Sequence, residues 1–334
     1  MNYIGSKLSL LPFIEDTIKD LVGDNLSDKV LCDLFAGTGI VGRAYKPRVK
    51  KVISNDWELY SYVLNRNYIG NHTEIEDKSD YLSFLNSLDG IEDGFIYNNY
   101  CLASGSGRQY FSDENGKRID AIRKQIEEWI KKESISEDLY YFLLSSLLES
   151  ADKYANTASV YGAFLKHLKT SAKKRMIIEP ALYSINENEH EVYCEDAGIL
   201  IKRISGDILY LDPPYNARQY GANYHLLNTI ADYRSFSPKG KTGLREYQRS
   251  SYCSKNSAIR SLFGLIKDAD FKYIILSYNN EGLMSFDEIR NAMSSYGKYG
   301  VYSLDYHRFR ADKEENRKHK ANKTTEYLHV LEKR

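Results

Sequence analysis

Residues 30–42 read VLCDLFAGTGIVG, a short apolar strand that runs into a glycine-rich turn and the start of a helix. Gly37 and Gly39 let the backbone approach a ligand closely, and Gly42 lets the helix pack against the strand. Such a turn also fits dinucleotide-binding proteins, although their usual phosphate-binding spacing is not met. Asp33, at the strand end, would repel a pyrophosphate and attract an ammonium group. The stretch therefore predicts a strand–turn–helix unit with a ligand site at the turn.

Residues 207–211, DILYL, are a second apolar run and lead directly into Asp212-Pro213-Pro214-Tyr215. The two prolines fix two φ angles and remove two backbone N–H donors, which makes a stiff turn after a buried strand. The carboxylate of Asp212 and the carbonyl of Pro213 can accept hydrogen bonds from an exocyclic amine, and Tyr215 can stack on a flat ring. This combination favours methylation of a ring amino group. The plain alternative is an ordinary strand-end turn.

Alternating strands and helices around these turns predict a mostly parallel α/β sheet. We expect helices over 7–22, 39–46 and 58–69, and strands over 29–34, 50–55, 191–195, 206–211, 272–277, 299–305 and 325–332. The last two strands predict an antiparallel hairpin across a charged loop at 311–323. Residues 74–185 are helical in pattern instead, most clearly over 119–123 and 139–148.

The composition is that of a globular chain. It has 334 residues, 42% of them hydrophobic, enough for one large domain with an insertion or for two domains. The four cysteines lack the spacing of a metal site, so we expect no metal and a reduced, cytoplasmic protein. No apolar run approaches the ~20 residues that a membrane helix needs, so we expect no membrane association.

Basic and acidic side chains balance, with 46 of each and a formal net charge of zero. A nucleic-acid binder is usually basic, so this balance disfavours nucleic acid as a partner. Charge is segregated, however, with basic residues in 166–175, 239–249 and 313–323 and acidic ones in 74–80, 127–138 and 187–196. Segregation can give a positive groove on a neutral protein, although any single basic cluster is more simply a solvated face.

A third motif precedes both turns, because residues 2–7 read NYIGSK. In this order, residues 2–7, 33–39 and 212–215 resemble the motifs of Dam-like, alpha-class (D12-type) adenine-specific DNA methyltransferases. The resemblance extends from residue 2 to a final strand at 326–329, EYLH. The ordered set is far more specific than the glycine turn alone.

The resemblance implies a Rossmann-like, S-adenosylmethionine-dependent methyltransferase fold. It implies a catalytic domain over 1–73 and 186–334 and a mainly helical, inserted target-recognition region that binds DNA over 74–185. The expected partners are double-stranded DNA and, functionally, a cognate type II restriction endonuclease. We expect a monomer, because each DNA strand is modified in a separate event. Related methylases of this size include enzymes with four-base palindromic targets such as CATG.

The resemblance also implies catalytic roles for the second turn in the methylation of adenine N6. The adenine N6 amine is a poor nucleophile because its lone pair is delocalised into the ring. Asp212 and Pro213 would accept its N–H bonds and concentrate charge on nitrogen, so that the methyl transfers directly without a covalent enzyme intermediate. Tyr215 would stack on an adenine flipped out of the duplex. The alternative for Tyr215 is a core tyrosine.

Several acidic residues predict contacts with S-adenosylmethionine. Asp33, beside the glycine turn, suits its ammonium group. Asp56 ends the second strand, where a carboxylate can accept from two ribose hydroxyls. Asp196 is our choice for the amine of the cofactor adenine, with Glu195 as an alternative that the sequence does not separate.

Four further residues complete the expected cofactor site. Trp57 lies on the cofactor adenine or belongs to the core, and the two interpretations are evenly balanced. Phe35 shields the sulfonium, with a core role as the alternative. The resemblance implies that Tyr3 and Lys7 belong to a segment over the methionine end, where Lys7 pairs with the cofactor carboxylate. Without the resemblance, a lone N-terminal lysine is usually solvated.

Two segments of 74–185 combine basic, amide and aromatic side chains: residues 108–111, RQYF, and residues 156–166, NTASVYGAFLK. Arginine and glutamine read base edges, and lysine contacts phosphate. We expect DNA contacts from among Arg108, Tyr161, Lys166, Lys169 and Lys173. Arg218 follows the second turn and contacts a phosphate or is an ordinary exposed arginine.

Other functions fit the same sequence less well. Methylation of RNA adenine is an alternative, but the long helical insert favours duplex recognition. Methylation of cytosine N4 is disfavoured because cytosine enzymes more often carry serine in place of Asp212. A non-catalytic DNA-binding regulator would be expected to have lost Asp212, Tyr215 or the glycine turn. A nicotinamide oxidoreductase lacks its complete nucleotide fingerprint.

Overall fold

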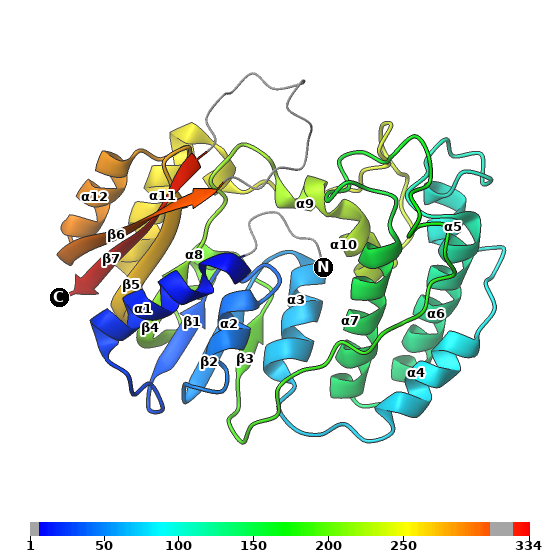
Figure 1. Cartoon of the computed structure of the whole chain (residues 1–334), viewed down its shortest axis with the longest axis horizontal. Helices are drawn as coiled ribbons and strands as arrows, with labels where there is room; N and C mark the ends of the chain where they lie inside the picture. Colours follow the sequence, from blue (N-terminus) through cyan, green and yellow to red (C-terminus); the bar gives the residue numbers. More distant parts are fainter. Residues whose placement is uncertain (1–6, 308–322) are drawn as a thin grey trace. The chain divides into compact units, whose positions relative to one another are not determined.

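The computed structural model describes residues 7–307 and 323–334. The chain forms two compact units. The sheet unit contains the described residues of 6–57, 188–219 and 249–334, and the helical unit contains those of 58–187 and 220–248. The elements of each unit are labelled in Figure 1.

The sheet unit is built around a seven-stranded sheet with the strand order β3-β2-β1-β4-β5-β7-β6. Its strands are β1 (Val30–Asp33), β2 (Lys51–Asn55), β3 (Glu191–Tyr193), β4 (Ser205–Leu211), β5 (Asp270–Asn279), β6 (Gly297–His307) and β7 (Lys323–Lys333). The first five pair in parallel, whereas β7 pairs antiparallel with β5 and β6. The predicted mostly parallel sheet and the antiparallel pairing of the last two strands are confirmed.

Helices cover both faces of this sheet (Figure 1). They are α1 (Leu11–Val22), α2 (Ile40–Tyr45), α8 (Ala197–Leu200), α11 (Lys255–Asp268) and α12 (Phe286–Ser294), with 3-10 turns at Leu8–Leu10 and Ser251–Cys253. The sequence fixes two of the helix starts. Pro12 lies in the first turn of α1, where its missing N–H costs nothing, and Ser285 and Glu288 form a capping box before α12.

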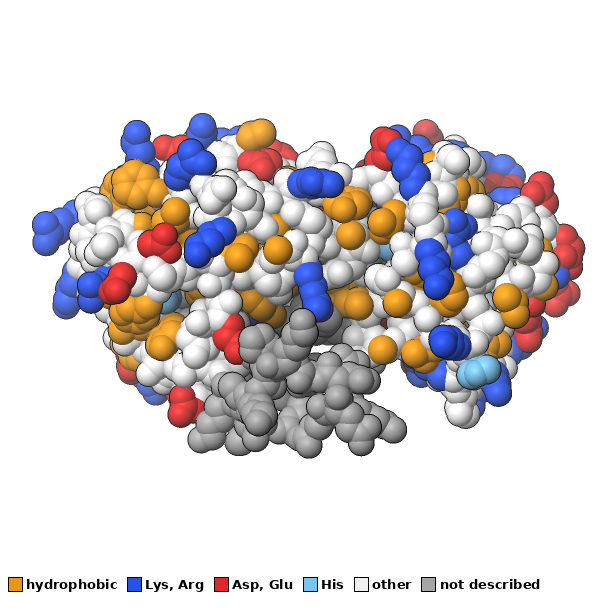
Figure 2. All heavy atoms as spheres, turned by 90° about the horizontal axis from the view of Figure 1, so that it is seen from above, with side chains coloured by type: hydrophobic (Ala, Val, Ile, Leu, Met, Phe, Trp, Pro, Cys, Tyr) orange, Lys and Arg blue, Asp and Glu red, His pale blue; other side chains and the backbone are white. Residues whose placement is uncertain are grey.

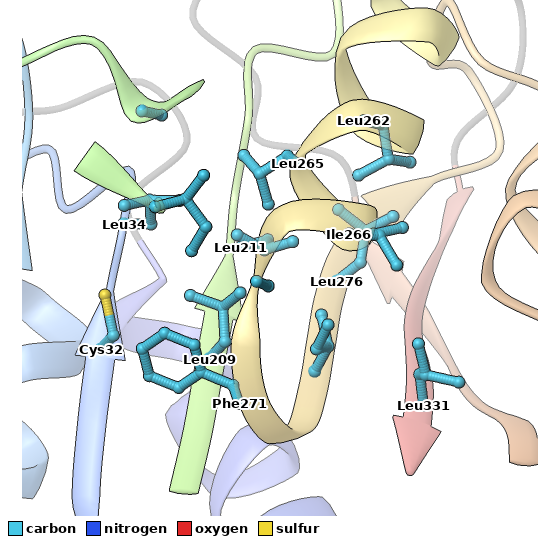
Figure 3. Close-up of a cluster of buried hydrophobic side chains, with 14 of the residues drawn as sticks. Cys32, Leu34, Leu209, Leu211, Leu262, Leu265, Ile266, Phe271, Leu276 and Leu331 are labelled. Atoms are coloured by element: carbon cyan, nitrogen blue, oxygen red, sulfur yellow. The ribbon is translucent and has the colours of Figure 1, made fainter. Parts of the chain in front are cut away.

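One face of the sheet packs against α8, α11 and α12 through a cluster of buried apolar side chains (Figure 3). Cys32 of β1, Leu209 of β4 and Leu265 of α11 belong to it. Successive residues of a strand point to opposite faces, so Asp33 and Tyr210 point to the other face. The alternation therefore leaves polar groups on the face opposite the apolar cluster, at the carboxyl ends of β1 and β4.

The helical unit contains α3 (Leu59–Asn65), a π-helical turn (Arg66–Gly70), α4 (Lys78–Ser87), α5 (Phe95–Tyr100), α6 (Asp113–Lys131), α7 (Glu137–Tyr154), α9 (Tyr220–Asn223) and α10 (His225–Asp232). Ser112 and Ser136 start α6 and α7 as N-caps, since their hydroxyls accept from backbone N–H groups of the first turn. The predicted periodic segments 119–123 and 139–148 lie within these two helices, as expected.

The second part of the predicted helical insert is not helical. Residues 155–187 contain turns but no helix or strand, and buried polar side chains hold their backbone instead. The Asn115 side chain donates to Lys174 O (2.9 Å) and accepts from Met176 N (2.8 Å), and Arg118 Nε donates to Met176 O (3.2 Å). Side-chain partners from α6 satisfy this backbone, which single-sequence periodicity cannot reveal. The helical unit also includes 58–73 and 220–248, beyond the predicted insert.

Candidate functional site

The strand order of the sheet reverses beside β1. The chain continues from β1 to β2 and β3 on one side, and β4 and β5 lie on the other. In open α/β sheets, ligands bind at such a reversal, outside the carboxyl ends of the strands. Asp33 ends β1 and is paired in register with Tyr210, two residues before Asp212. The structure therefore brings the two predicted turns together where this fold favours a ligand.

The glycine turn after β1 is held by carboxylates. Gly37 and Gly39 have φ values of 53° and 73°, in the left-handed region that glycine adopts most readily. Gly37 N donates to Asp56 Oδ2 (2.9 Å), and Gly42 N donates to Asp33 Oδ2 (3.2 Å). Asp56, predicted as a ribose acceptor, thus also orients the turn from the end of β2.

Asn55 is a functional candidate that the sequence did not reveal. It is 2% exposed, at the end of β2. Its Nδ2 donates to Leu34 O (3.1 Å) and Glu195 O (3.2 Å), and its Oδ1 accepts from Glu195 N (3.1 Å). One amide therefore joins the carboxyl ends of β1, β2 and β3, which carry most of the predicted cofactor residues. The signal in the sequence was only a polar residue ending a buried strand.

Each of the two acidic candidates after β3 has a local partner. Asp196 is exposed and caps α8, where its Oδ1 accepts from Gly198 N (2.9 Å) and Ile199 N (3.2 Å). Glu195 forms an ion pair with Arg203. A carboxylate with one such partner retains further acceptor capacity. Either residue can therefore still accept a hydrogen bond from the amine of the cofactor adenine.

The two aromatic candidates are half-buried in the sheet unit. Phe35 packs edge-to-face against Tyr252 with the ring centroids 5.1 Å apart, and borders the apolar cluster. Trp57 follows Asp56, and its carbonyl accepts from the exposed thiol of Cys194 (3.7 Å). Both side chains keep partial exposure, and both residues follow the carboxyl ends of strands, β1 for Phe35 and β2 for Trp57.

Lys7 lies at the start of the described chain and contacts the second turn. Its Nζ is 2.9 Å from Asp212 Oδ1, and the lysine is buried. Burial raises the pKa of Asp212, and the ammonium of Lys7 opposes that increase. The predicted partner of Lys7 was the cofactor carboxylate, so its pairing with Asp212 is a difference from that expectation. Tyr3, the other predicted residue of this segment, lies outside the described residues.

The face around Lys7 is acidic. The pKa of Asp33 is raised to about 7, chiefly by burial; the charges of Asp212 and Asp56 contribute to the increase, and the Gly42 N–H and Lys7 oppose it. Burial also raises the pKa of Glu326 on β7; the charge of Lys7 lowers this pKa, and the charge of Asp212 raises it. Carboxyl groups that are buried together hold protons more tightly, and an incoming cation stabilises their ionised forms. The arrangement therefore suits a positively charged ligand.

The rest of the Asp212–Tyr215 turn is rigid and partly open. Pro213 is buried, and the ring of Tyr215 is half-buried against the apolar cluster. Tyr215 O accepts from Leu283 N (3.0 Å), which fixes the turn to the loop after β5. The part of the ring that remains exposed is available for stacking.

A pocket of about 590 Å³ adjoins this loop. Aromatic side chains of β5, α12 and β7 line it, together with polar groups of the loop. Phe286 packs against Tyr327 and His329, with centroids 5.3 Å and 5.2 Å away. The aromatic lining comes from three separate elements, so no local pattern in the sequence predicted it.

The residues predicted to bind DNA have different surroundings. Tyr161 is fully buried, and its hydroxyl donates to Asp152 (2.9 Å), so contact with a ligand would require it to leave this packing. Arg108 donates to the carbonyls of Asn99 and Gly240, both at 3.0 Å. Lys169 is half-buried and donates to Thr157 O (3.2 Å).

Three of the predicted DNA-binding side chains are exposed. Lys166 and Lys173 lie on the irregular segment of the helical unit, and Arg218 lies in the sheet unit. On the face seen in Figure 2, Lys and Arg side chains stand apart among mostly uncharged ones. These three side chains are accessible to a polyanion, whereas Tyr161 and Arg108 support the fold around them.

The sheet order, the glycine turn and the acidic face define a Rossmann-like methyltransferase fold. Residues 3–292 match the family of D12 class N6 adenine-specific DNA methyltransferases, and the chain belongs to this family. The family that the three motifs resembled is thereby confirmed.

Similar proteins agree with this assignment. The chain is 64% identical to "Type II methyltransferase M.NlaIII" of Neisseria lactamica, over 100% of this chain and 99% of the relative. It is 38% identical to "Type II methyltransferase M.CviAII" of Paramecium bursaria Chlorella virus 1, over 93% of each. It is 37% identical to "Type II methyltransferase M.FokI" of Planomicrobium okeanokoites, where it covers 53% of that longer protein. Among the described residues, no helix is long and apolar enough to cross a membrane.

Proposed function

We propose that the chain is a site-specific enzyme that transfers a methyl group from S-adenosylmethionine to the N6 atom of an adenine in double-stranded DNA. The observation that carries this proposal is the position of Asp212 across the strand reversal from Asp33. A carboxylate for a target amine and a carboxylate for a cationic cofactor then lie at neighbouring strand ends. The family of the chain supports the same reaction.

The residues of the sheet unit fit S-adenosylmethionine by charge. When bound, this cofactor supplies a methyl group activated on a sulfonium, close to its ammonium group. Asp33 would hold the ammonium. Burial and the charges of Asp212 and Asp56 raise the pKa of Asp33, and a bound cation would stabilise its ionised form. The glycine turn and Asp56 would hold the ribose side, and Phe35 would border the sulfonium.

Asp212 would carry the largest share of catalysis by the protein. Its carboxylate and the Pro213 carbonyl would accept hydrogen bonds from the amine. Nitrogen becomes positive as it forms a bond to the methyl carbon and the bond from that carbon to sulfur breaks, and it then releases one proton to Asp212 or to water. A nearby negative charge stabilises that state more than the ground state. Lys7 opposes the effect of burial on the pKa of Asp212 and so favours the ionised carboxylate.

Tyr215 would stack on the target adenine. The N6 atom lies inside the duplex, so the base must leave the stack before Asp212 can reach it. The ring is half-buried, and a backbone hydrogen bond from Leu283 N to Tyr215 O holds the turn that carries it; both observations support a role as a platform for an extruded base.

We assign target recognition to the helical unit, within which the predicted region 74–185 lies. Lys166 and Lys173 support this role because they are exposed and free to neutralise phosphates. The type II names of the relatives support a second part of the proposal, that methylation protects DNA from a cognate restriction endonuclease. Monomeric action fits the modification of one strand at a time.

The test is to incubate the purified chain with labelled S-adenosylmethionine and unmethylated bacterial genomic DNA, and then to sequence the DNA for modified bases. N6-methyladenine in one short context supports the proposal and identifies the target site, whether it is a four-base palindrome such as CATG or another sequence. Transfer to RNA alone, or modification of cytosine, would replace the proposal with the corresponding alternative. Tight DNA binding without transfer would favour a non-catalytic regulator.

A further inference from the structure

The hydroxyl of Tyr210 is an anomaly on the functional face of the sheet. Tyr210 is 1% exposed, and within the described part of the chain its hydroxyl has no hydrogen-bond partner of normal geometry. Ser277 on β5 is close enough to lower the pKa of the phenol, but burial dominates and raises it. A buried polar group without a partner destabilises a protein, and such groups are rare. A function that uses the hydroxyl would explain why it is kept.

Tyr210 lies in the middle of the acidic face. It is paired in register with Asp33 across β1 and β4, and it points to the same face as Asp212, two residues further on. The charges of Asp212, Asp33 and Glu326 all act on its hydroxyl. The hydroxyl therefore stands among the groups that would surround the methionine end of the cofactor.

We propose that the Tyr210 hydroxyl is a cofactor-binding group that accepts a hydrogen bond from the ammonium of S-adenosylmethionine, beside the carboxylate of Asp33. This inference rests on the proposed function and adds a residue to its site. A phenol oxygen has a free acceptor position, and an ammonium has three donors to distribute. The proposal gives a second protein acceptor to that ammonium.

The charged groups around the Tyr210 hydroxyl favour contact with a cationic group of the ligand. A ligand carboxylate would be repelled by Asp33, Asp212 and Glu326, whereas an ammonium is attracted by all three. Lys7 is already paired with Asp212 at 2.9 Å, so it leaves the rest of this face negative. The incoming group next to Tyr210 is therefore the cationic one.

The test compares Tyr210→Phe with the matched control Tyr45→Phe, which removes a hydroxyl from another buried tyrosine of the sheet unit. Two ligands are titrated by calorimetry: S-adenosylhomocysteine, which carries the amino-acid end, and 5′-methylthioadenosine, which lacks it. We expect Tyr210→Phe to weaken S-adenosylhomocysteine about tenfold, as for a lost hydrogen bond to a charged group, and to leave 5′-methylthioadenosine unchanged. We expect the control to leave both unchanged.

The melting temperature of the ligand-free variants gives a second, independent readout. Because Tyr210→Phe removes a buried hydroxyl without a partner, its melting temperature should equal or exceed that of the wild type. Equal weakening of both ligands, unchanged binding of S-adenosylhomocysteine, or a lower melting temperature would each overturn the inference. Failure of the wild type to bind S-adenosylhomocysteine would instead overturn the proposed function.

Discussion

The ammonium of Lys7 lies 2.9 Å from a carboxylate oxygen of Asp212. Both side chains are largely buried, so neither charge is well solvated. Burial disfavours the charge on Lys7, but the carboxylates of Asp212 and Glu326 more than compensate, and its pKa is raised. For Asp212 burial prevails, and its pKa is raised despite Lys7. Lys7 therefore favours the ionised form of Asp212 against the effect of burial.

Removing Lys7 should change how methyl transfer depends on pH. In Lys7→Met the opposing charge is lost, so the pKa of Asp212 rises further. Because the ionised carboxylate is the proposed active form, the acidic limb of the rate profile should move to higher pH. We expect a loss of about tenfold or more at pH 6 and a smaller loss at pH 8, measured as single-turnover rates with saturating cofactor.

The matched control for this change is Lys19→Met, which removes an exposed lysine paired with Asp24 in the same unit. Its pH profile should coincide with that of the wild type. A rate in Lys7→Met that falls by the same factor at every pH would contradict the electrostatic role and indicate a structural one.

The sequence pointed to those parts of the candidate site that are local in the chain. Asp33 with its glycine turn, and Asp212 with its two prolines, are each contained in a few consecutive residues, so strand-end patterns were sufficient. Asn55 and Tyr210 were missed because their proposed roles depend on register. Asn55 binds the backbone of Glu195, 140 positions away, and Tyr210 meets Asp33 only through the pairing of β1 with β4. No short pattern carries that information.

The fold shows the same division. The strands were predicted because alternating apolar runs and turns identify them. Residues 155–185 were predicted as helical, but Asn115 and Arg118 hold part of their backbone in irregular turns. Such side-chain partners from a neighbouring helix override local propensity.

Asn55 should act as a positioning residue for the cofactor. Asn55→Ala removes three hydrogen bonds and leaves the Leu34 carbonyl and both Glu195 backbone groups without this partner. We expect a loss of about 2–4 kcal/mol in unfolding free energy, measured in urea. We also expect a raised KM for S-adenosylmethionine, with kcat and the KM for DNA little changed. A fall in kcat alone would be inconsistent with a role through the cofactor strands.

Lys166 and Lys173 should contribute to DNA binding through phosphates. Replacing both with alanine should weaken binding to every duplex sequence tested. It should also make the slope of log affinity against log salt less steep by about 2 if each lysine neutralises one phosphate. The control, Lys131→Ala with Lys132→Ala, removes the same charge from exposed positions at the end of α6. Equal effects of both pairs would show that only net charge matters.

Asp212 should be needed for transfer and not for binding. Asp212→Asn keeps the size and an acceptor oxygen but removes the charge that stabilises the developing positive nitrogen. We expect turnover to fall by about 10²–10³, while duplex binding and S-adenosylhomocysteine binding stay within a few-fold of the wild type. Near-normal turnover would end the proposed role of this carboxylate. Circular dichroism should accompany the assay, because the change leaves Lys7 without its buried counter-charge.

Cofactor binding should depend on pH through Asp33. Its pKa is raised to about 7 by burial and by Asp212 and Asp56, and only the ionised carboxylate attracts an ammonium group. The ionised fraction rises with pH through that value, so affinity for S-adenosylhomocysteine should increase by about eightfold from pH 6 to pH 7.5 and level off above. Asp33→Asn should bind weakly at both pH values and lose the dependence. If the variant keeps the wild-type slope, another group is responsible, and Asp33 does not hold the ammonium.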